Sequence, residues 1–81
     1  NIGIFPNPTK GKFNLSFNSL NHEELLVSIS DLSGKRIKSL EFDASSGQNL
    51  MQFDLSSFAE GVYLVKINTS NGSKTMRIIK E

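Results

Sequence analysis

Short runs in which apolar and polar residues alternate occupy most of the chain, and this period of two is the feature that most constrains its fold. The clearest run is Lys12–Asn18. Its apolar members Phe13, Leu15 and Phe17 would share one face of a strand, because successive side chains of a strand point to opposite faces. Runs of this kind return about every 8 to 12 residues with turn-forming residues between them, a spacing typical of a β-sandwich or β-barrel.

Seven such runs predict seven strands. They span Ile2–Phe5, Lys12–Asn18, Glu24–Ser30, Lys35–Phe42, Gln48–Asp54, Val62–Thr69 and Ser73–Lys80. Short strands without helices between them predict two packed antiparallel sheets. At 81 residues the chain is expected to form a single domain over residues 1–81. Its core should be small, because a chain of this size buries only about 60 to 65% of its unfolded surface.

Three segments depart from simple alternation. Ile37 and Leu40 would face opposite sides of a regular strand, so we expect a bulge or a twist between them. Leu55–Gly61 has helical spacing but is too short for a stable helix, which predicts one tight turn. Asn71-Gly72 lies between two apolar runs and predicts a hairpin turn, since both residues tolerate a positive φ.

A turn with two prolines, Pro6–Gly11, separates the first two expected strands. Pro6 and Pro8 fix φ near about −65° and bias the residue before each toward extended geometry. Gly11 then supplies a conformation that other residues resist. Because this chemistry is mostly backbone shape, we expect the turn to bend the entering chain and present the domain rather than to catalyse a reaction.

Gly61 and Tyr63 form a second pattern, in which a tyrosine opens a strand just after a turn glycine. Val65 and Ile67 lie on the same strand face as Tyr63. In immunoglobulin-like sandwiches such a tyrosine buries its ring and returns its hydroxyl group to the upstream backbone. The pattern predicts a tyrosine corner, and with it an all-β, immunoglobulin-like antiparallel β-sandwich of Greek-key topology in which Tyr63 is structural.

Candidate catalytic and metal-binding groups are few. The chain has no cysteine, which excludes disulfides and thiolate metal sites. Its one histidine, His22, precedes Glu23 and Glu24, and adjacent carboxylates lack the spacing of metal ligands. Aspartates are expected to bond their own backbone at three strand ends, at Asp31, Asp43 and Asp54. We therefore expect no enzyme activity, no cofactor and no metal site, and a surface position for His22.

Charge is balanced along the chain as a whole. Nine basic and eight acidic residues leave a net charge of +1, so no broad field favours a nucleic-acid backbone or an anionic membrane. No apolar run is long enough to span a membrane. Neither a nucleic-acid partner nor direct membrane insertion is therefore expected.

The last expected strand carries basic residues at every third position, Lys74, Arg77 and Lys80, beside the apolar Ile78 and Ile79. In one interpretation these charges discourage edge-to-edge aggregation of a terminal strand. In the other, the strand docks on a partner through its main chain and these side chains. The two interpretations are compatible.

Four segments in a fixed order resemble one protein family. They are Pro6-Asn7-Pro8-Thr9-Lys10-Gly11-Lys12-Phe13, Val27–Lys35, Gly61–Tyr63 and Lys74–Lys80. Together they resemble the type A C-terminal sorting domain of the type IX secretion system of Bacteroidetes, over essentially the whole chain. The turn residues that carry the resemblance are Pro6, Asn7, Pro8, Gly11, Gly34, Lys35, Gly61 and Tyr63. Phe5 stands where the family often has tyrosine, and Glu81 follows the usual Ile-Ile-Lys ending.

The resemblance implies an immunoglobulin-like domain at the C-terminus of a secreted protein, with a cargo protein before residue 1. It implies that the cargo crosses the inner membrane by an ordinary leader and passes from the periplasm through the outer-membrane type IX translocon to the cell surface or beyond. A sortase commonly removes the domain, and the cargo is released or linked to surface lipopolysaccharide. The domain is then a substrate and not an enzyme. Residues expected to contact the translocon are Lys74, Arg77, Ile78, Ile79 and Lys80.

Two other functions fit the same fold class. A carbohydrate-binding or adhesive β-sandwich would need exposed aromatic rings, and the chain has no tryptophan. Phe5, Phe42 and Phe58 are the phenylalanines that remain candidates for the surface. An inert spacer would share the fold and lack any sorting activity.

Overall fold

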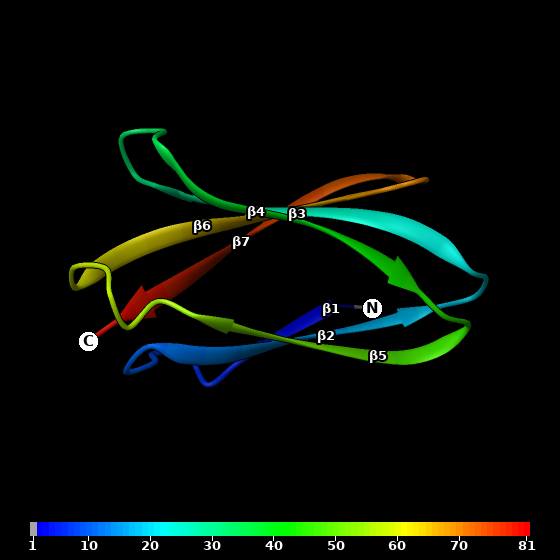
Figure 1. The fold of residues 1–81 in the computed structure, drawn as a ribbon, viewed down its shortest axis with the longest axis horizontal. Helices are drawn as coiled ribbons and strands as arrows, with labels where there is room; N and C mark the ends of the chain where they lie inside the picture. The colour runs from blue at the N-terminus through cyan, green and yellow to red at the C-terminus, as the bar shows by residue number, and fades with distance from the viewer. Residues whose placement is uncertain (1) are drawn as a thin grey trace.

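The computed structural model describes residues 2–81 and contains two antiparallel sheets that lie face to face (Figure 1). Its strands are β1 (Ile2–Phe5), β2 (Lys12–Ser19), β3 (Glu23–Asp31), β4 (Arg36–Ala44), β5 (Gly47–Asp54), β6 (Gly61–Thr69) and β7 (Gly72–Lys80). Each expected strand is present, and its ends lie within about two residues of the expected ones. The predicted all-β fold is therefore confirmed.

The chain passes repeatedly between the two sheets. One sheet has the strand order β1-β2-β5, and the other has the order β4-β3-β6-β7. Because β2 pairs with β5 and β3 pairs with β6, strands that are distant in sequence are neighbours in space. All these pairs are antiparallel. This arrangement is the Greek-key sandwich that the sequence predicts.

Inward-facing side chains of both sheets form the core. Phe13 of β2 lies opposite Phe53 of β5, and their rings stack with centroids 5.3 Å apart. The buried cluster consists of Phe13, Leu15, Val27, Ile29, Met51, Phe53, Leu55, Tyr63, Val65, Ile67 and Ile78. Ile78 is the member from β7, so burial holds the last strand to the domain in addition to its pairing with β6.

Ile37 lies in a bulge on β4. The register shifts between Ile29 and Ser30 of the paired strand β3, and Ile37 is the extra residue. In a regular strand Ile37 and Leu40 would lie on opposite faces. Because of the bulge, Ile37 packs against the core and Leu40 also lies on the inner face, opposite Val27. The predicted irregularity is confirmed, and its position is Ile37 itself.

The β6–β7 hairpin is present, but its turn comes one residue earlier than the Asn-Gly pattern predicts. Thr69 pairs with Gly72, which leaves Ser70 and Asn71 as the loop residues. Gly72 has a φ of 128°, whereas Asn71 does not have a positive φ. Instead, the Asn71 N–H donates to Thr69 Oγ1 at 3.0 Å. A side chain therefore closes the turn that the prediction assigned to two positive φ angles.

The connection from β5 to β6 is one tight turn, as predicted. The N–H of Phe58 donates to the carbonyl oxygen of Leu55 at 3.0 Å, and the Leu55 side chain is fully buried. Tyr63 follows in β6 with its ring buried, and its hydroxyl group donates to the carbonyl oxygen of Ala59. The tyrosine corner is therefore confirmed, and Tyr63 is structural.

Candidate functional site

The proline turn lies against the last strand, although the two are at opposite ends of the sequence. The side-chain amide of Asn7 donates to the carbonyl oxygen of Arg77 at 2.8 Å, and Asn7 Oδ1 accepts the N–H of Ile79 at 3.0 Å. Figure 1 shows the red end of β7 descending toward the layer of the three-stranded sheet, from which the turn emerges. The Asn7 side chain therefore takes the place of a neighbouring strand beside β7.

Thr9 continues this contact through its backbone. Its N–H donates to the carbonyl oxygen of Ile79, and its carbonyl oxygen accepts the N–H of Glu81, both at 2.8 Å. Its buried hydroxyl group accepts the N–H of Gly11 at 3.0 Å and donates to the carbonyl oxygen of Lys12. Thr9 is not among the predicted site residues. A threonine shortly before a turn glycine could have indicated it, because threonine hydroxyl groups stabilise turns.

Gly11 lies where the proline turn meets the β5–β6 connection. Its carbonyl oxygen accepts the N–H of Leu55 at 2.8 Å. A Cβ atom on Gly11 would lie 2.5 Å from Ser56 Oγ and 3.2 Å from Ser56 Cα, and the φ of Gly11 is 152°. Gly61 has a similar φ of 151°, but an added Cβ there would meet no described atom within 4 Å. Gly11 is therefore required by its φ and by close approach, and Gly61 by its φ alone.

Gly34 and Lys35 belong to the turn between β3 and β4. Asp31 Oδ1 accepts the N–H groups of Ser33 and Lys35 at 3.0 Å each, and the Ser33 hydroxyl group at 2.7 Å. These bonds, the one from the Ser33 hydroxyl group first, hold the pKa of Asp31 below its ordinary value of 3.8. The segment is therefore a hairpin turn closed by a side chain, and Asp31 bonds its own backbone as expected.

β7 is an edge strand, and the proline turn covers only part of its free edge. In an antiparallel pair, alternate residues direct both backbone groups to the partner strand, and the residues between them direct theirs away. The bonds to the proline turn show that Arg77 and Ile79 face away from β6. By the same alternation, the backbone N–H and C=O groups of Ser73 and Thr75 also point away from β6. We define the open edge as the outward backbone groups of Ser73 and Thr75 together with the Arg77 N–H, which have no hydrogen-bond partner among residues 2–81.

The five residues expected to contact a translocon do not form one surface. Ile78 is fully buried in the core, so its side chain is not available to a partner while the domain is folded. Lys80 is half-buried, and its Nζ donates to a backbone carbonyl of the β5–β6 turn at 2.6 Å. Lys74 and Arg77 are exposed but project from opposite faces of β7, because three positions separate them. Ile79 is exposed at 37% on the same face as Arg77.

Charge is strongly biased on this side of the molecule. The β6–β7 hairpin, residues 61–80, contains no aspartate or glutamate. Its basic residues are Lys66, Lys74, Arg77 and Lys80. Although the net charge of the whole chain is small, every charged residue of the β6–β7 hairpin is basic. This hairpin lies at the edge of the larger sheet, which fits the edge-protection interpretation.

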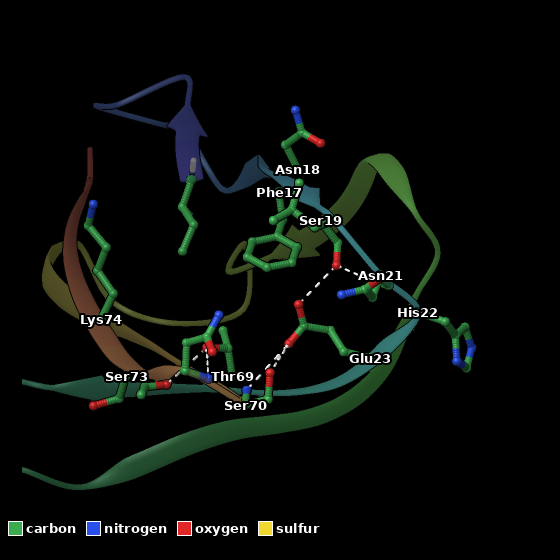
Figure 2. A pocket seen from close by; sticks show the side chains of 14 residues that line it. Phe17, Asn18, Ser19, Asn21, His22, Glu23, Thr69, Ser70, Ser73 and Lys74 are labelled. Atoms are coloured by element: carbon green, nitrogen blue, oxygen red, sulfur yellow. Dashed lines mark hydrogen bonds between the residues drawn. The ribbon is translucent and has the colours of Figure 1, made fainter.

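A hollow of about 760 Å³ opens between the sheets beside the β6–β7 turn. Ile2 and Phe17 line it from the three-stranded sheet, and Lys74 lines it from β7. Figure 2 shows the Phe17 ring within the hollow and Glu23 reaching into it from β3. The hollow therefore borders the inner face of β7 at the end where the free edge is open.

Glu23 links two turns at this end of the sandwich. Its Oε2 accepts the Ser19 hydroxyl group at 2.9 Å, and its Oε1 accepts the hydroxyl group and N–H of Ser70 at 3.0 and 3.3 Å. These bonds, the one from Ser19 first, lower the pKa of Glu23 from its ordinary value of 4.5. His22 is exposed, and Figure 2 shows its ring pointing away from Glu23. Its expected surface position is confirmed.

Other kinds of site find little support. Within residues 2–81, no group of three or more side chains is placed to hold a metal ion, and no helix is long and apolar enough to cross a membrane. Phe5 is exposed at 48%, but Phe42 and Phe58 are half-buried and pack against the core. A single exposed ring makes a poor platform for sugar binding, which disfavours the carbohydrate-binding alternative.

The fold and the site together define an immunoglobulin-like β-sandwich whose first turn and last strand are joined at a sheet edge. Residues 3–81 match the family described as the secretion system C-terminal sorting domain. The chain belongs to this family, whose members are C-terminal sorting signals of type IX secretion in Bacteroidetes. Family membership implies a preceding cargo protein, type IX machinery as the partner, and a destination at the cell surface or outside the cell. No curated protein matches the chain.

Proposed function

We propose that the type IX translocon recognises this domain in its folded state, on the side where β7 meets the proline turn. The observation that carries the proposal is the pairing of the turn with Arg77 and Ile79, which joins the first and last family segments in one structural unit. If the translocon recognised an unfolded tail, this contact between the proline turn and β7 would not be needed. Lys74, Arg77 and Ile79 are the exposed residues of the proposed contact, while Lys80 holds the tail in place.

The domain acts in this proposal as a substrate and not as an enzyme. Its perturbed carboxylates are each bonded to serines of nearby turns, as Asp31 and Glu23 illustrate. Asp54 is bonded in the same way, to the N–H and hydroxyl group of Ser56. These hydrogen bonds are the largest cause of their lowered pKa values. A catalytic role is not needed to explain them.

The route of export is part of the same proposal. A cargo protein before residue 1 crosses the inner membrane with its own leader, and residues 1–81, as one domain, direct it from the periplasm through the outer-membrane translocon. A sortase then removes the domain, and the cargo is released or linked to surface lipopolysaccharide. Support comes from the family match over residues 3–81 and from the two packed sheets that these residues form.

A fusion experiment tests the proposal. Residues 1–81 are placed behind a fluorescent protein that is exported to the periplasm, in a bacterium with a working type IX system and in a translocon-deficient strain. We expect fluorescence at the cell surface or in the medium only in the first strain. A destabilised variant, Ile78→Ala, separates folded from tail recognition. If it is exported as well as the parent although its purified form is unfolded, recognition of the folded state is wrong.

A further inference from the structure

The uncovered part of β7 has the dimensions of a short strand-binding site. Its outward groups run from Ser73 to the Arg77 N–H, and beyond that point the proline turn occupies the edge. Five residues of strand span about 16 Å, at about 3.3 Å per residue. Unpaired backbone groups of an edge strand are a template for a further strand from another chain. The proline turn thus sets where an added strand must end.

The hollow beside β7 provides a place for side chains of an added strand. Every second residue of such a strand points to the inner face of the sheet. At the open edge this inner face is the hollow, with Ile2 and Phe17 on its far side and Lys74 beside it. Glu23 is the acidic group in the hollow, and both its oxygens are already bonded to Ser19 and Ser70. An apolar side chain therefore has apolar surface to cover, with the positively charged Lys74 next to it.

The positive charge of the β6–β7 hairpin indicates which kind of segment can bind at the open edge. Lys74 borders the inner face of the open edge and Arg77 its outer face, and no acidic residue lies in residues 61–80 to offset them. Opposite charges on neighbouring strands are favourable, and like charges are unfavourable. A second copy of this chain paired through the same edge would bring two basic hairpins together. An acidic segment is favoured over a self-complementary dimer for this reason.

We propose that the open edge accepts an extended segment of a partner protein, about five residues long, that adds to β7 as a further strand. Its inward side chains are apolar and cover the hollow near Phe17, and acidic side chains flank them toward Lys74 and Arg77. The inference specifies the partner chemistry of the sorting signal and therefore rests on the proposed function.

A proline substitution tests strand addition in cells. Thr75→Pro removes an N–H that faces away from β6, so the pairing of β6 and β7 keeps its hydrogen bonds. Thr75→Val keeps the N–H and serves as the matched control. In the fluorescent fusion we expect export to fall at least about tenfold for the proline variant and to stay within about twofold for the valine variant, with both purified domains folded. Equal export of the folded proline variant and the parent would overturn the inference and leave the sorting function standing.

Charge reversal is the second arm of the export test. Lys74→Glu with Arg77→Glu should reduce export at least about tenfold, whereas Arg36→Glu with Lys38→Glu, on the opposite edge strand β4, should not. If both pairs have the same effect, an acidic partner is excluded. If the parent fusion itself is not exported, the proposed function fails, and the inference is then judged by binding alone.

Binding to the purified domain, residues 1–81, provides that independent measurement. The probe is a synthetic peptide of alternating valine and glutamate, and the control peptide has lysine in place of glutamate. We expect the acidic peptide alone to slow amide hydrogen exchange at Ser73, Thr75 and Arg77 by about tenfold or more at millimolar concentration, and a copy N-methylated at alternate amides to lose the effect. Equal protection by both peptides, or none by either, would contradict the inference. Protection without peptide in a concentration-dependent dimer would assign the edge to a second copy and also contradict it.

Discussion

Asn7 pairs with β7 as though it were part of a strand. Its side-chain oxygen accepts the N–H of Ile79 at 3.0 Å, and its side-chain NH₂ group donates to the carbonyl oxygen of Arg77. A side chain thereby satisfies two backbone groups that β6 cannot reach. This contact joins the first turn of the domain to its last strand, and it makes the end of β7 part of the folded structure rather than a free tail.

Asn7→Ala should lower the free energy of unfolding by about 1 to 2 kcal/mol, because two partly solvated hydrogen bonds are lost. Asn7→Asp is the informative comparison. It keeps the acceptor for the Ile79 N–H but places a carboxylate oxygen beside the carbonyl of Arg77. We therefore expect it to remain less stable than the parent, as Asn7→Ala is. Urea denaturation measures both variants, and a fully stable Asn7→Ala protein would show that the contact contributes nothing.

Gly11→Ala and Gly61→Ala form a matched pair, because the two glycines have φ angles of 152° and 151°. Both variants adopt an unfavourable backbone conformation, at about 1 to 3 kcal/mol each. Only at Gly11 does the new methyl group also collide with Ser56. We therefore expect the larger loss of thermal stability for Gly11→Ala. Equal melting temperatures for the two variants would mean that the loop yields to the methyl group.

Ile78→Ala and Ile79→Ala separate folding from surface contact in the tail. Ile78 is fully buried, and its truncation should cost about 2 to 5 kcal/mol. Ile79 is 37% exposed, so its truncation should cost clearly less. Chemical denaturation of the two purified variants is the measurement. Similar losses for both would place Ile79 in the core as well.

Tyr63→Phe isolates the hydrogen bond of the tyrosine corner. It leaves the ring in place and removes the donor to the Ala59 carbonyl oxygen, at a cost of about 1 to 2 kcal/mol. Tyr63→Ala also removes the buried ring and should cost about 3 to 5 kcal/mol. Circular dichroism melts compare the three proteins. An unchanged melt for Tyr63→Ala would refute the corner.

Stability should decline in acid. The pKa values of Asp31 and Asp54 lie below their ordinary value of 3.8, first because of the hydroxyl groups of Ser33 and Ser56, and that of Glu23 lies below 4.5. The folded state therefore binds fewer protons than the unfolded state near pH 4, so stability is fully present above the unfolded pKa values and is lost as pH falls through the folded ones. Melting temperature measured from pH 7 to pH 2 should drop below about pH 4. Asp31→Asn should flatten that drop, and an unchanged pH profile would mean that the turn bonds do not favour the ionised carboxylate.

The strands were predictable because the signals for them are local. At Lys12–Ser19, each buried residue alternates with a more exposed one, as the apolar pattern indicates. The corner at Tyr63 was also predictable, since the glycine, the tyrosine and the accepting carbonyl lie within a few residues. The turn at Ser70–Asn71 was placed one residue too late, because the Thr69 hydroxyl group competes with the Asn-Gly pattern for control of the loop.

The candidate site was less predictable. Sequence spacing groups Lys74, Arg77 and Lys80 with Ile78, but the sheet places them differently. Ile78 is buried, and Lys80 is hydrogen-bonded to a backbone carbonyl. Lys74 and Arg77 project from opposite faces of β7. Thr9 was missed because its importance comes from bonds to Ile79 and Glu81. Such contacts depend on how two sheets pack.

Taken by itself, the sequence determined the number of strands, their inward faces, the tyrosine corner and the turn residues, because each depends on neighbours along the chain. Only the tertiary structure decided which part of β7 the proline turn covers, which basic residues of β7 are exposed, and that Asn7 meets Ile79 across 72 positions of sequence. The physical reason is that these features depend on where two sheets place their edges, and that placement follows from burial of the whole core rather than from any local pattern.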